Sequence, residues 1–97
     1  MPAYIWATVN SGEPQAYAAY AKAAAQVAAQ FGGDYVVRGL IDTVYEGDCE
    51  EASRAILIRF PDEAAARAYM ASPDYQAAKA LRMGAGGAVH ARLVVSV

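Results

Sequence analysis

The chain has 97 residues, of which 57% are hydrophobic and 19% charged, and its formal net charge at neutral pH is −2. This length predicts one domain over residues 1–97. The composition excludes a charge-dominated disordered chain, and the charge balance excludes the basic surface that nucleic acids and anionic membranes require. The sequence shows neither a signal-peptide pattern nor an apolar run of about 20 residues. We therefore expect a soluble, cytoplasmic protein that binds neither nucleic acid nor membrane.

The first half of the chain predicts a strand, a helix and a second strand. Side chains alternate over residues 3–9, which is typical of a strand with two different faces. Pro14 is suited to the first position of a helix, and apolar residues at spacings of three and four predict that this helix covers residues 14–30. β-Branched and aromatic residues predict a long strand over residues 34–46, in which Gly39 indicates a bulge or a bend.

The second half predicts the same elements in the order strand, helix, strand. Alternate positions are apolar over residues 53–60, which predicts a strand. Asp62 is expected to cap a second helix, which Ser72 and the proline after it interrupt before a further turn to about residue 82. Alternation returns over residues 89–97 and predicts the last strand. The expected connections are a turn over residues 47–51 and a glycine-rich segment over residues 83–88.

The predicted fold is two strand–helix–strand halves joined by a hairpin. Because such crossovers are right-handed, both helices lie on one face of a four-stranded antiparallel sheet of ferredoxin-like type, an α+β fold. The apolar rows belong under the helices: Ile5, Ala7 and Val9; Ile56, Ile58 and Phe60; Val89, Ala91, Leu93 and Val95. The opposite face then holds Tyr4, Trp6, Thr8, Leu57, Arg59, His90, Arg92 and Val94.

This opposite face is too apolar to be left in water and too polar to be a simple core. Exposed patches of this kind mark an interface or a ligand groove. The simplest arrangement that covers the face is a two-fold homodimer in which two sheets pack against each other. A monomer with an exposed sheet is the alternative.

Several short motifs follow one another in an order that is typical of one family. They are Gly32-Gly33-Asp34-Tyr35-Val36-Val37-Arg38-Gly39, Tyr45-Glu46-Gly47-Asp48, Phe60-Pro61 and Ser72-Pro73-Asp74-Tyr75-Gln76. Together they resemble the domain-of-unknown-function 1330 family, within the dimeric α/β-barrel superfamily, over nearly the whole chain. The resemblance implies a ferredoxin-like protomer in a barrel-forming homodimer. It implies no particular reaction, because related families include cofactor-independent monooxygenases, isomerases, cyclases and haem enzymes.

Three residues are candidates for catalysis. Arg38, in the first of these motifs, could bind a carboxylate or enolate oxygen through two parallel hydrogen bonds, or it could pair with a nearby carboxylate. His90 is the only histidine, and because histidine is the side-chain type whose ordinary pKa lies nearest neutral pH, it is a candidate acid or base. A histidine in solvent or at an interface is the alternative. Glu46 could act as a base near Arg38 or form a surface ion pair.

Five further residues are candidates for ligand binding: Tyr4, Trp6, Tyr35, Arg59 and Arg92. Tyr4 and Trp6 could line an apolar cavity or be the aromatic anchors of a dimer. Arg59 and Arg92 share one predicted face, where they would favour an anionic ligand or be solvated. The tyrosines at helical spacing are expected to serve packing: Tyr17, Tyr20, Tyr69 and Tyr75.

Metal and thiol chemistry have little support in the sequence. One histidine and one cysteine give no cluster with the spacing of a metal site. Cys49 alone cannot form an internal disulfide, and no cationic neighbour in the sequence would activate it as a nucleophile. We therefore expect no metal and no built-in cofactor.

Two functions remain. The first is a small-molecule-binding homodimer that acts as a cofactor-independent enzyme, between helices and sheet or inside the dimer. It would carry out proton transfer, rearrangement or oxygenation of a small anionic or aromatic compound, with Arg38 stabilising charge and His90 or Glu46 moving the proton. The second is a non-catalytic dimeric binding or accessory protein. We favour a ligand-binding domain.

Overall fold

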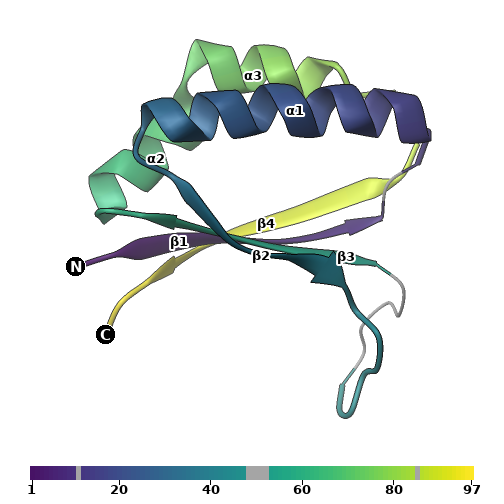
Figure 1. Cartoon of the computed structure of the whole chain (residues 1–97), viewed down its shortest axis with the longest axis horizontal. Helices are drawn as coiled ribbons and strands as arrows, with labels where there is room; N and C mark the ends of the chain where they lie inside the picture. Colours follow the sequence, from purple (N-terminus) through teal and green to yellow (C-terminus); the bar gives the residue numbers. More distant parts are fainter. Residues whose placement is uncertain (11, 48–52, 85) are drawn as a thin grey trace.

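The computed structural model describes residues 1–10, 12–47, 53–84 and 86–97. A four-stranded antiparallel sheet with the order β2-β3-β1-β4 has the helices of the described chain on one face (Figure 1). This is the ferredoxin-like fold that the sequence predicts. In chain order the elements are β1 (Ala3–Asn10), α1 (Pro14–Gln30), β2 (Asp34–Leu40), β3 (Arg54–Phe60), α2 (Glu63–Ala71), α3 (Pro73–Ala80) and β4 (Ala88–Val95).

Each helix begins at a polar residue that caps it. The Glu13 carboxylate accepts hydrogen bonds from the first backbone N–H groups of α1. The Asp62 carboxylate accepts one from the Ala65 N–H at 2.8 Å, which caps α2. Ser72 ends α2 and caps α3, because its hydroxyl accepts a hydrogen bond from the Tyr75 N–H at 3.0 Å. The expected interruption of the second helix is therefore confirmed.

The second strand is shorter than predicted. β2 ends at Leu40, so the expectation of a strand through Glu46 is wrong for residues 41–46. The ladder stops because β3 begins only at Arg54; the last connection is the hydrogen bond from the Ile41 N–H to the Ser53 carbonyl, at 2.8 Å. Residues 41–47 then leave the sheet on the side away from the helices (Figure 1). Apart from Gly47, the expected turn at 47–51 lies outside the described residues, as does Cys49.

The bulge in β2 lies at Val36 and not at Gly39. Tyr35 is opposite Ile58 and Val37 is opposite Leu57, so Val36 is an extra residue in the ladder. Gly39 pairs regularly, opposite Ala55. The extra residue inverts the alternation of all that follows it, which changes the face on which the C-terminal half of β2 presents its side chains.

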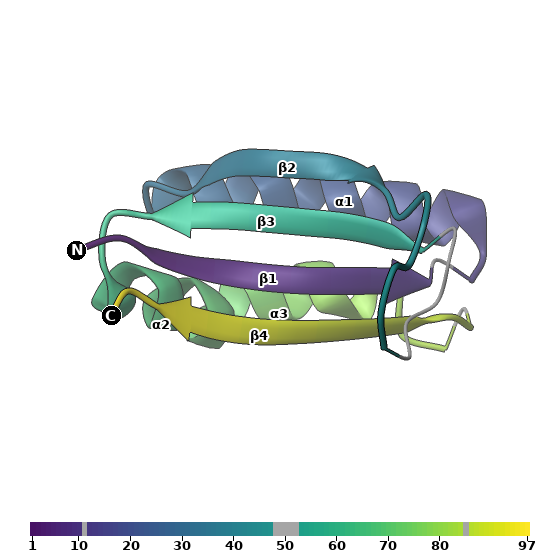
Figure 2. The same cartoon turned by 90° about the horizontal axis from the view of Figure 1, so that it is seen from below.

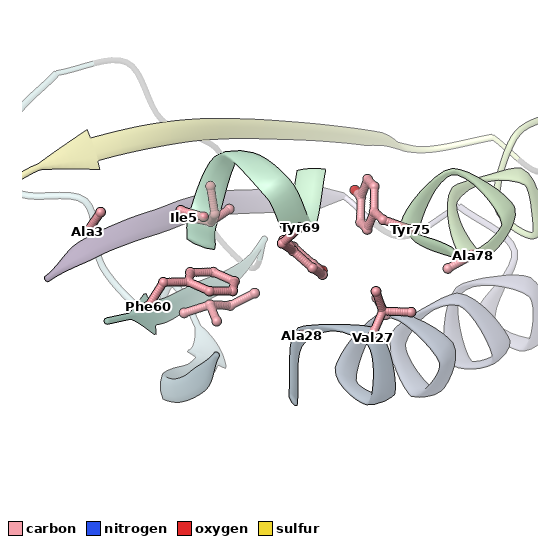
Figure 3. Packing of buried hydrophobic residues seen from close by; sticks show 11 residues of the cluster. Ala3, Ile5, Val27, Ala28, Phe60, Tyr69, Tyr75 and Ala78 are labelled. Atoms are coloured by element: carbon pink, nitrogen blue, oxygen red, sulfur yellow. The ribbon is translucent and has the colours of Figure 1, made fainter. Parts of the chain in front are cut away.

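The core lies between the helices and the sheet. Figure 3 shows Tyr69 of α2 between Phe60 of β3 and Tyr75 of α3, with Val27 and Ala28 of α1 alongside. The ring centroid of Tyr69 is 5.2 Å from that of Phe60 and 4.9 Å from that of Tyr75. The buried hydrophobic residues are Ala3, Ile5, Ala7, Val9, Ala24, Val27, Ala28, Ile58, Phe60, Ala66, Tyr69, Tyr75 and Ala78.

The edge strand β4 is covered less completely than the central strands. Its row Val89, Ala91, Leu93 and Val95 pairs with the buried row of β1, as predicted. Ala91 is nevertheless exposed, and Val95 keeps 44% of its surface accessible. The other face of the sheet, which no helix covers (Figure 2), carries the predicted mixed row of aromatic, aliphatic and charged residues. No helix of the described residues is long and apolar enough to cross a membrane.

Candidate functional site

A pocket of about 640 Å³ lies between the helices and the sheet. Binding sites for small molecules have volumes of roughly 300–1,000 Å³, so the pocket is large enough for one. Its floor is the buried face of the sheet, and its roof is α1 together with parts of α2 and α3. Small residues of α1, namely Ala21, Ala24 and Ala25, face this space and leave it open.

Tyrosines form much of the pocket wall: Tyr17, Tyr20, Tyr35, Tyr69 and Tyr75. The hydroxyl oxygens of Tyr20 and Tyr75 lie 3.1 Å apart and share a hydrogen bond. Burial raises the pKa of Tyr20 and Tyr69 well above the usual range, and neighbouring tyrosines raise it further. These hydroxyls therefore stay protonated at neutral pH. Four of the five had been expected to serve packing, which Tyr69 and Tyr75 do, but they line the pocket as well.

Two arginines stand at the exposed end of the pocket. The guanidinium carbon of Arg38 lies 4.2 Å from the ring centroid of Tyr35, and that of Arg54 lies 5.5 Å from the ring centroid of Tyr17. They are diagonal neighbours on the helix side of the sheet, because Arg38 is opposite Ile56 and Arg54 begins the same row. Among the described residues no carboxylate forms an ion pair with either arginine.

The charge of the pocket is positive. Lys22 of α1 lines it together with Arg38 and Arg54, and none of the described lining residues is aspartate, glutamate or histidine. Burial raises the pKa of Tyr17 and Tyr35, while the arginines nearby act in the opposite direction. The arrangement can bind an anionic group at its outer end and apolar or aromatic groups further in.

Sequence reasoning missed Arg54, although a signal for it was present. Arg54 precedes Ile56, Ile58 and Phe60 at spacings of two, so it shares their face of the strand. A charged residue at the start of an otherwise apolar row is exposed at the sheet margin and faces the helices. For Arg38, counting alternate positions would give the wrong face of the sheet, because the bulge at Val36 lies between Arg38 and the start of its strand.

The structure divides the predicted site residues between the two faces of the sheet. Arg38 and Tyr35 line the pocket. Five others lie on the face away from the helices: Tyr4, Trp6, Arg59, His90 and Arg92. Glu46 is in the exposed segment that follows β2. In the single chain, therefore, the three candidate catalytic residues do not meet in one cavity.

On the open face the candidate residues make weak contacts with one another. An Arg59 Nη2 atom is 4.0 Å from a carboxylate oxygen of Asp34, and both side chains are more than half exposed. Arg92 donates a hydrogen bond of 3.4 Å to the Thr8 hydroxyl. His90 is opposite Thr8 in the β1–β4 register and is exposed. Such contacts contribute little to stability.

The comparison with protein families decides what kind of chain this is. The family model described as a domain of unknown function, DUF1330, matches residues 2–96. The chain belongs to the DUF1330 family. The resemblance seen in the sequence is thereby confirmed. No functionally curated protein matches this DUF1330 chain.

Solved structures with the same fold come from several bacteria. A protein of unknown function from Rhodopseudomonas palustris, RPA0582, superposes with a TM-score of 0.79 at 20% identity, over 99% of the DUF1330 chain and 82% of its own. A dimeric ferredoxin-like protein of unknown function from Jannaschia sp. gives 0.68 at 20% identity, over 99% and 100%. SnoaB, a cofactor-independent oxygenase from Streptomyces nogalater, gives 0.64 at 17% identity, over 99% and 92%. At these identities the likeness shows the fold alone.

A metal centre finds no support in the described part of this DUF1330 chain. There, no group of three or more histidine, cysteine, aspartate or glutamate side chains is placed to hold a metal ion. The pocket residues offer guanidinium groups and neutral phenols, which bind oxygen anions and carbonyl groups and are poor metal ligands. These groups can bind an oxygen anion or a carbonyl group.

Proposed function

We propose that this DUF1330 protein binds a small organic anion in the pocket between its helices and its sheet. The observation that carries the proposal is the pair Arg38 and Arg54, which stand at the exposed end of one pocket without a carboxylate partner among the described residues. An arginine that is not paired with a carboxylate keeps hydrogen-bond donors for a ligand, and its planar group matches a carboxylate.

The two aromatic rings beneath the arginines support the same role. The Tyr35 ring lies under Arg38, and the Tyr17 ring lies beside Arg54, so each guanidinium is held against a flat surface. Holding a long side chain in this way lowers the conformational entropy that is lost when a ligand binds. The arginines are thus prepared for an anion before it arrives.

The apolar wall of the pocket determines what kind of body the ligand has beyond its anionic group. Below the arginines the sheet contributes Ile5, Ile56 and Ile58, and α2 contributes Met70. Burial of an apolar or aromatic body against these side chains gives a favourable free energy in proportion to the area covered. The ligand that fits is an aromatic or similarly flat compound with one anionic end.

The proposal is tested by titrating the purified protein with benzoate and naphthoate in a calorimeter. Arg38→Met and Arg54→Met should each weaken binding roughly tenfold or more, since a hydrogen bond to a charged group contributes about 1.5–3 kcal/mol. Arg59→Met is the matched control, because Arg59 lies on the other face of the sheet, and it should bind as the parent does. Equal affinities in all four proteins would remove the pocket from consideration.

A second candidate is cofactor-independent catalysis in the same pocket, which the shared fold of SnoaB, a cofactor-independent oxygenase, favours. Since no described lining residue is a histidine or a carboxylate, such chemistry would depend on Arg38 and Arg54 stabilising an enolate or phenolate form of the substrate. The roles expected for His90 and Glu46 do not enter this candidate, because neither lines the pocket. Oxygen uptake with hydroxynaphthoate that disappears in Arg38→Met would support it; binding without uptake assigns a non-catalytic role.

We also propose that two copies of the chain pair through the open faces of their sheets. That face carries the half-buried Tyr4, Trp6 and Leu57, and Val94 with 47% of its surface exposed. Residues 41–47 project on the same side (Figure 1), and they include Tyr45, which is 92% exposed. Solvated aromatic residues beside an apolar sheet face are typical of a surface that a partner covers.

Charge complementarity favours a second copy as that partner. The open face carries the basic side chains of Arg59 and Arg92, and the projecting segment carries Asp42 and Glu46. In a two-fold arrangement each segment can approach the basic face of the other copy, so every favourable contact occurs twice. The similar structure from Jannaschia sp. is described as dimeric, which agrees with this proposal.

A further inference from the structure

The pocket wall contains a pair of hydroxyl groups. Tyr20 of α1 and Tyr75 of α3 both line the pocket, and their hydroxyl oxygens are 3.1 Å apart. The two rings meet edge to face with their centroids 6.3 Å apart, which holds both hydroxyls in place. Tyr75 is 3% exposed. The pair is therefore a fixed polar site in the wall of the pocket.

Counting protons shows that this pair has a hydrogen-bond donor to spare. Each neutral phenol carries one hydrogen, and the bond between the two hydroxyls uses only one of them. No carbonyl or carboxylate group of the described chain accepts a hydrogen bond from either hydroxyl. Arg82, whose guanidinium carbon lies 4.8 Å from the ring centroid of Tyr20, has donors only and cannot accept it. One phenolic hydrogen is thus free for a group inside the pocket.

A neutral oxygen is the acceptor that fits this position. Burial raises the pKa of Tyr20, so the pair acts as a donor and not as a base at neutral pH. A second anionic group here would lose its hydration next to buried Tyr69 and Tyr75, a cost that the nearby Arg82 guanidinium offsets only in part. A ketone or other carbonyl oxygen accepts the hydrogen bond without that cost.

We propose that the natural ligand is an aromatic or similarly flat carboxylate that also carries a carbonyl oxygen, with the carboxylate bound by Arg38 and Arg54 and the carbonyl oxygen bound by the Tyr20–Tyr75 pair. This inference rests on the proposed binding of organic anions in the pocket. It adds a second polar group to the ligand and the residues that bind it. The apolar body of the ligand packs against the isoleucines of the sheet.

The test compares two probes that differ only in the carbonyl oxygen: para-acetylbenzoate and para-isopropylbenzoate, with their biphenyl homologues to cover a longer span. The parent protein should bind the acetyl compound of at least one length about 2- to 10-fold more tightly, which is the range for one net neutral hydrogen bond. Tyr20→Phe and Tyr75→Phe each leave one hydroxyl with its hydrogen, so each single variant should keep part of the preference. The double variant should lose it.

The controls separate this inference from the proposal on which it rests. Arg38→Met should weaken acetyl and isopropyl probes by the same factor and leave their ratio unchanged. If neither length shows a preference in the parent, or if the double variant keeps it, the inference is overturned while anion binding stands. If no probe binds the parent protein, both the proposed anion binding and the inference about the carbonyl group fail. The parent ratio decides the matter even where the double variant unfolds.

Discussion

The guanidinium of Arg38 lies over the ring of Tyr35, 4.2 Å from its centroid, although residues three apart in a regular strand face opposite sides. The extra residue Val36 brings them together: Tyr35 is opposite Ile58 and Arg38 is opposite Ile56, two residues of the same face. The bulge thus places an aromatic surface and a cation next to each other at the pocket, as bulges do near functional sites.

A double-mutant cycle on benzoate binding measures this contact. Tyr35→Leu should weaken binding about 2- to 5-fold, the equivalent of a cation–π contact of about 0.5–1 kcal/mol. In an Arg38→Met background the same change should have almost no further effect, so the two substitutions are not additive. Tyr35→Leu combined with Arg59→Met is the control and should be additive. Additivity of both pairs would show that Tyr35 does not position Arg38.

Gly33 is held in a space too small for a side chain, whereas Gly39 is not. A Cβ atom at Gly33 would lie 2.8 Å from Cε1 of Phe60 and 2.9 Å from the Ala28 carbonyl oxygen. Gly39 has no atom within 4 Å of the corresponding position. Gly33→Ala should lower the free energy of unfolding by about 1–3 kcal/mol through overpacking. Gly39→Ala should change it by less than about 0.5 kcal/mol. Urea unfolding measures both, and equal effects would contradict the packing seen around Phe60.

Much of the fold could be predicted because its signals are local. Alternation in β1, the helix start at Asp62 and the interruption at Ser72 each depend on a few neighbouring residues. The length of β2 could not, since it depends on where β3 begins to pair with it. The face of the sheet on which Arg38 lies could not be predicted either, because an extra residue such as Val36 leaves the sequence pattern of a strand unchanged.

The pocket itself could not be predicted from the sequence for a different reason. The residues of α1 that face the sheet are apolar and helix-forming, and the same pattern describes a helix packed tightly on a sheet. Here several of them are alanines, among them Ala21 and Ala24, and their small side chains leave space above Ile56. The periodicity of the sequence shows which positions are apolar, but it does not show how much space their side chains leave unfilled.

Filling that space should abolish ligand binding without unfolding the protein. Ala21 of α1 lines the pocket, so Ala21→Leu places a larger apolar side chain in it while keeping a good helix former. Benzoate and naphthoate binding should fall at least about tenfold, since a leucine occupies room that the ligand's apolar body needs. Ala18→Leu on the exposed side of α1 is the control and should bind normally. Normal binding by both variants would place the ligand elsewhere.

The buried tyrosines predict how stability depends on alkaline pH. Burial raises the pKa of Tyr69 in the folded state, whereas the unfolded chain titrates near the ordinary value of about 10. Above that value the folded state binds more protons than the unfolded state, so stability falls as pH rises. The free energy of unfolding should be level up to about pH 9 and then decline by up to about 1.4 kcal/mol per pH unit for each such tyrosine. Tyr69→Phe should reduce the decline; an unchanged slope would mean that Tyr69 is not responsible.

The proposed pairing of two chains predicts a change of mass when charge is placed on the open face. Trp6, the single tryptophan, is opposite Leu57 and Arg92 at the centre of that face. Trp6→Glu would bury an unpaired carboxylate between two sheets, which costs several kcal/mol. Sedimentation should therefore show twice the 10.2 kDa chain mass for the parent and a single chain for the variant.

Leu81→Glu is the control for this experiment, because Leu81 is a 48% exposed apolar residue that follows α3 in the helical layer. It should sediment as the parent does, since it adds the same charge on the covered side of the molecule. Trp6 fluorescence provides a second readout: the emission of the parent should shift to longer wavelength on dilution as the face becomes hydrated, with no loss of secondary structure. The proposed dimer would be excluded if the parent sedimented as one chain at micromolar concentration with emission typical of hydrated tryptophan. Such a result would show that the open sheet face is stable in water.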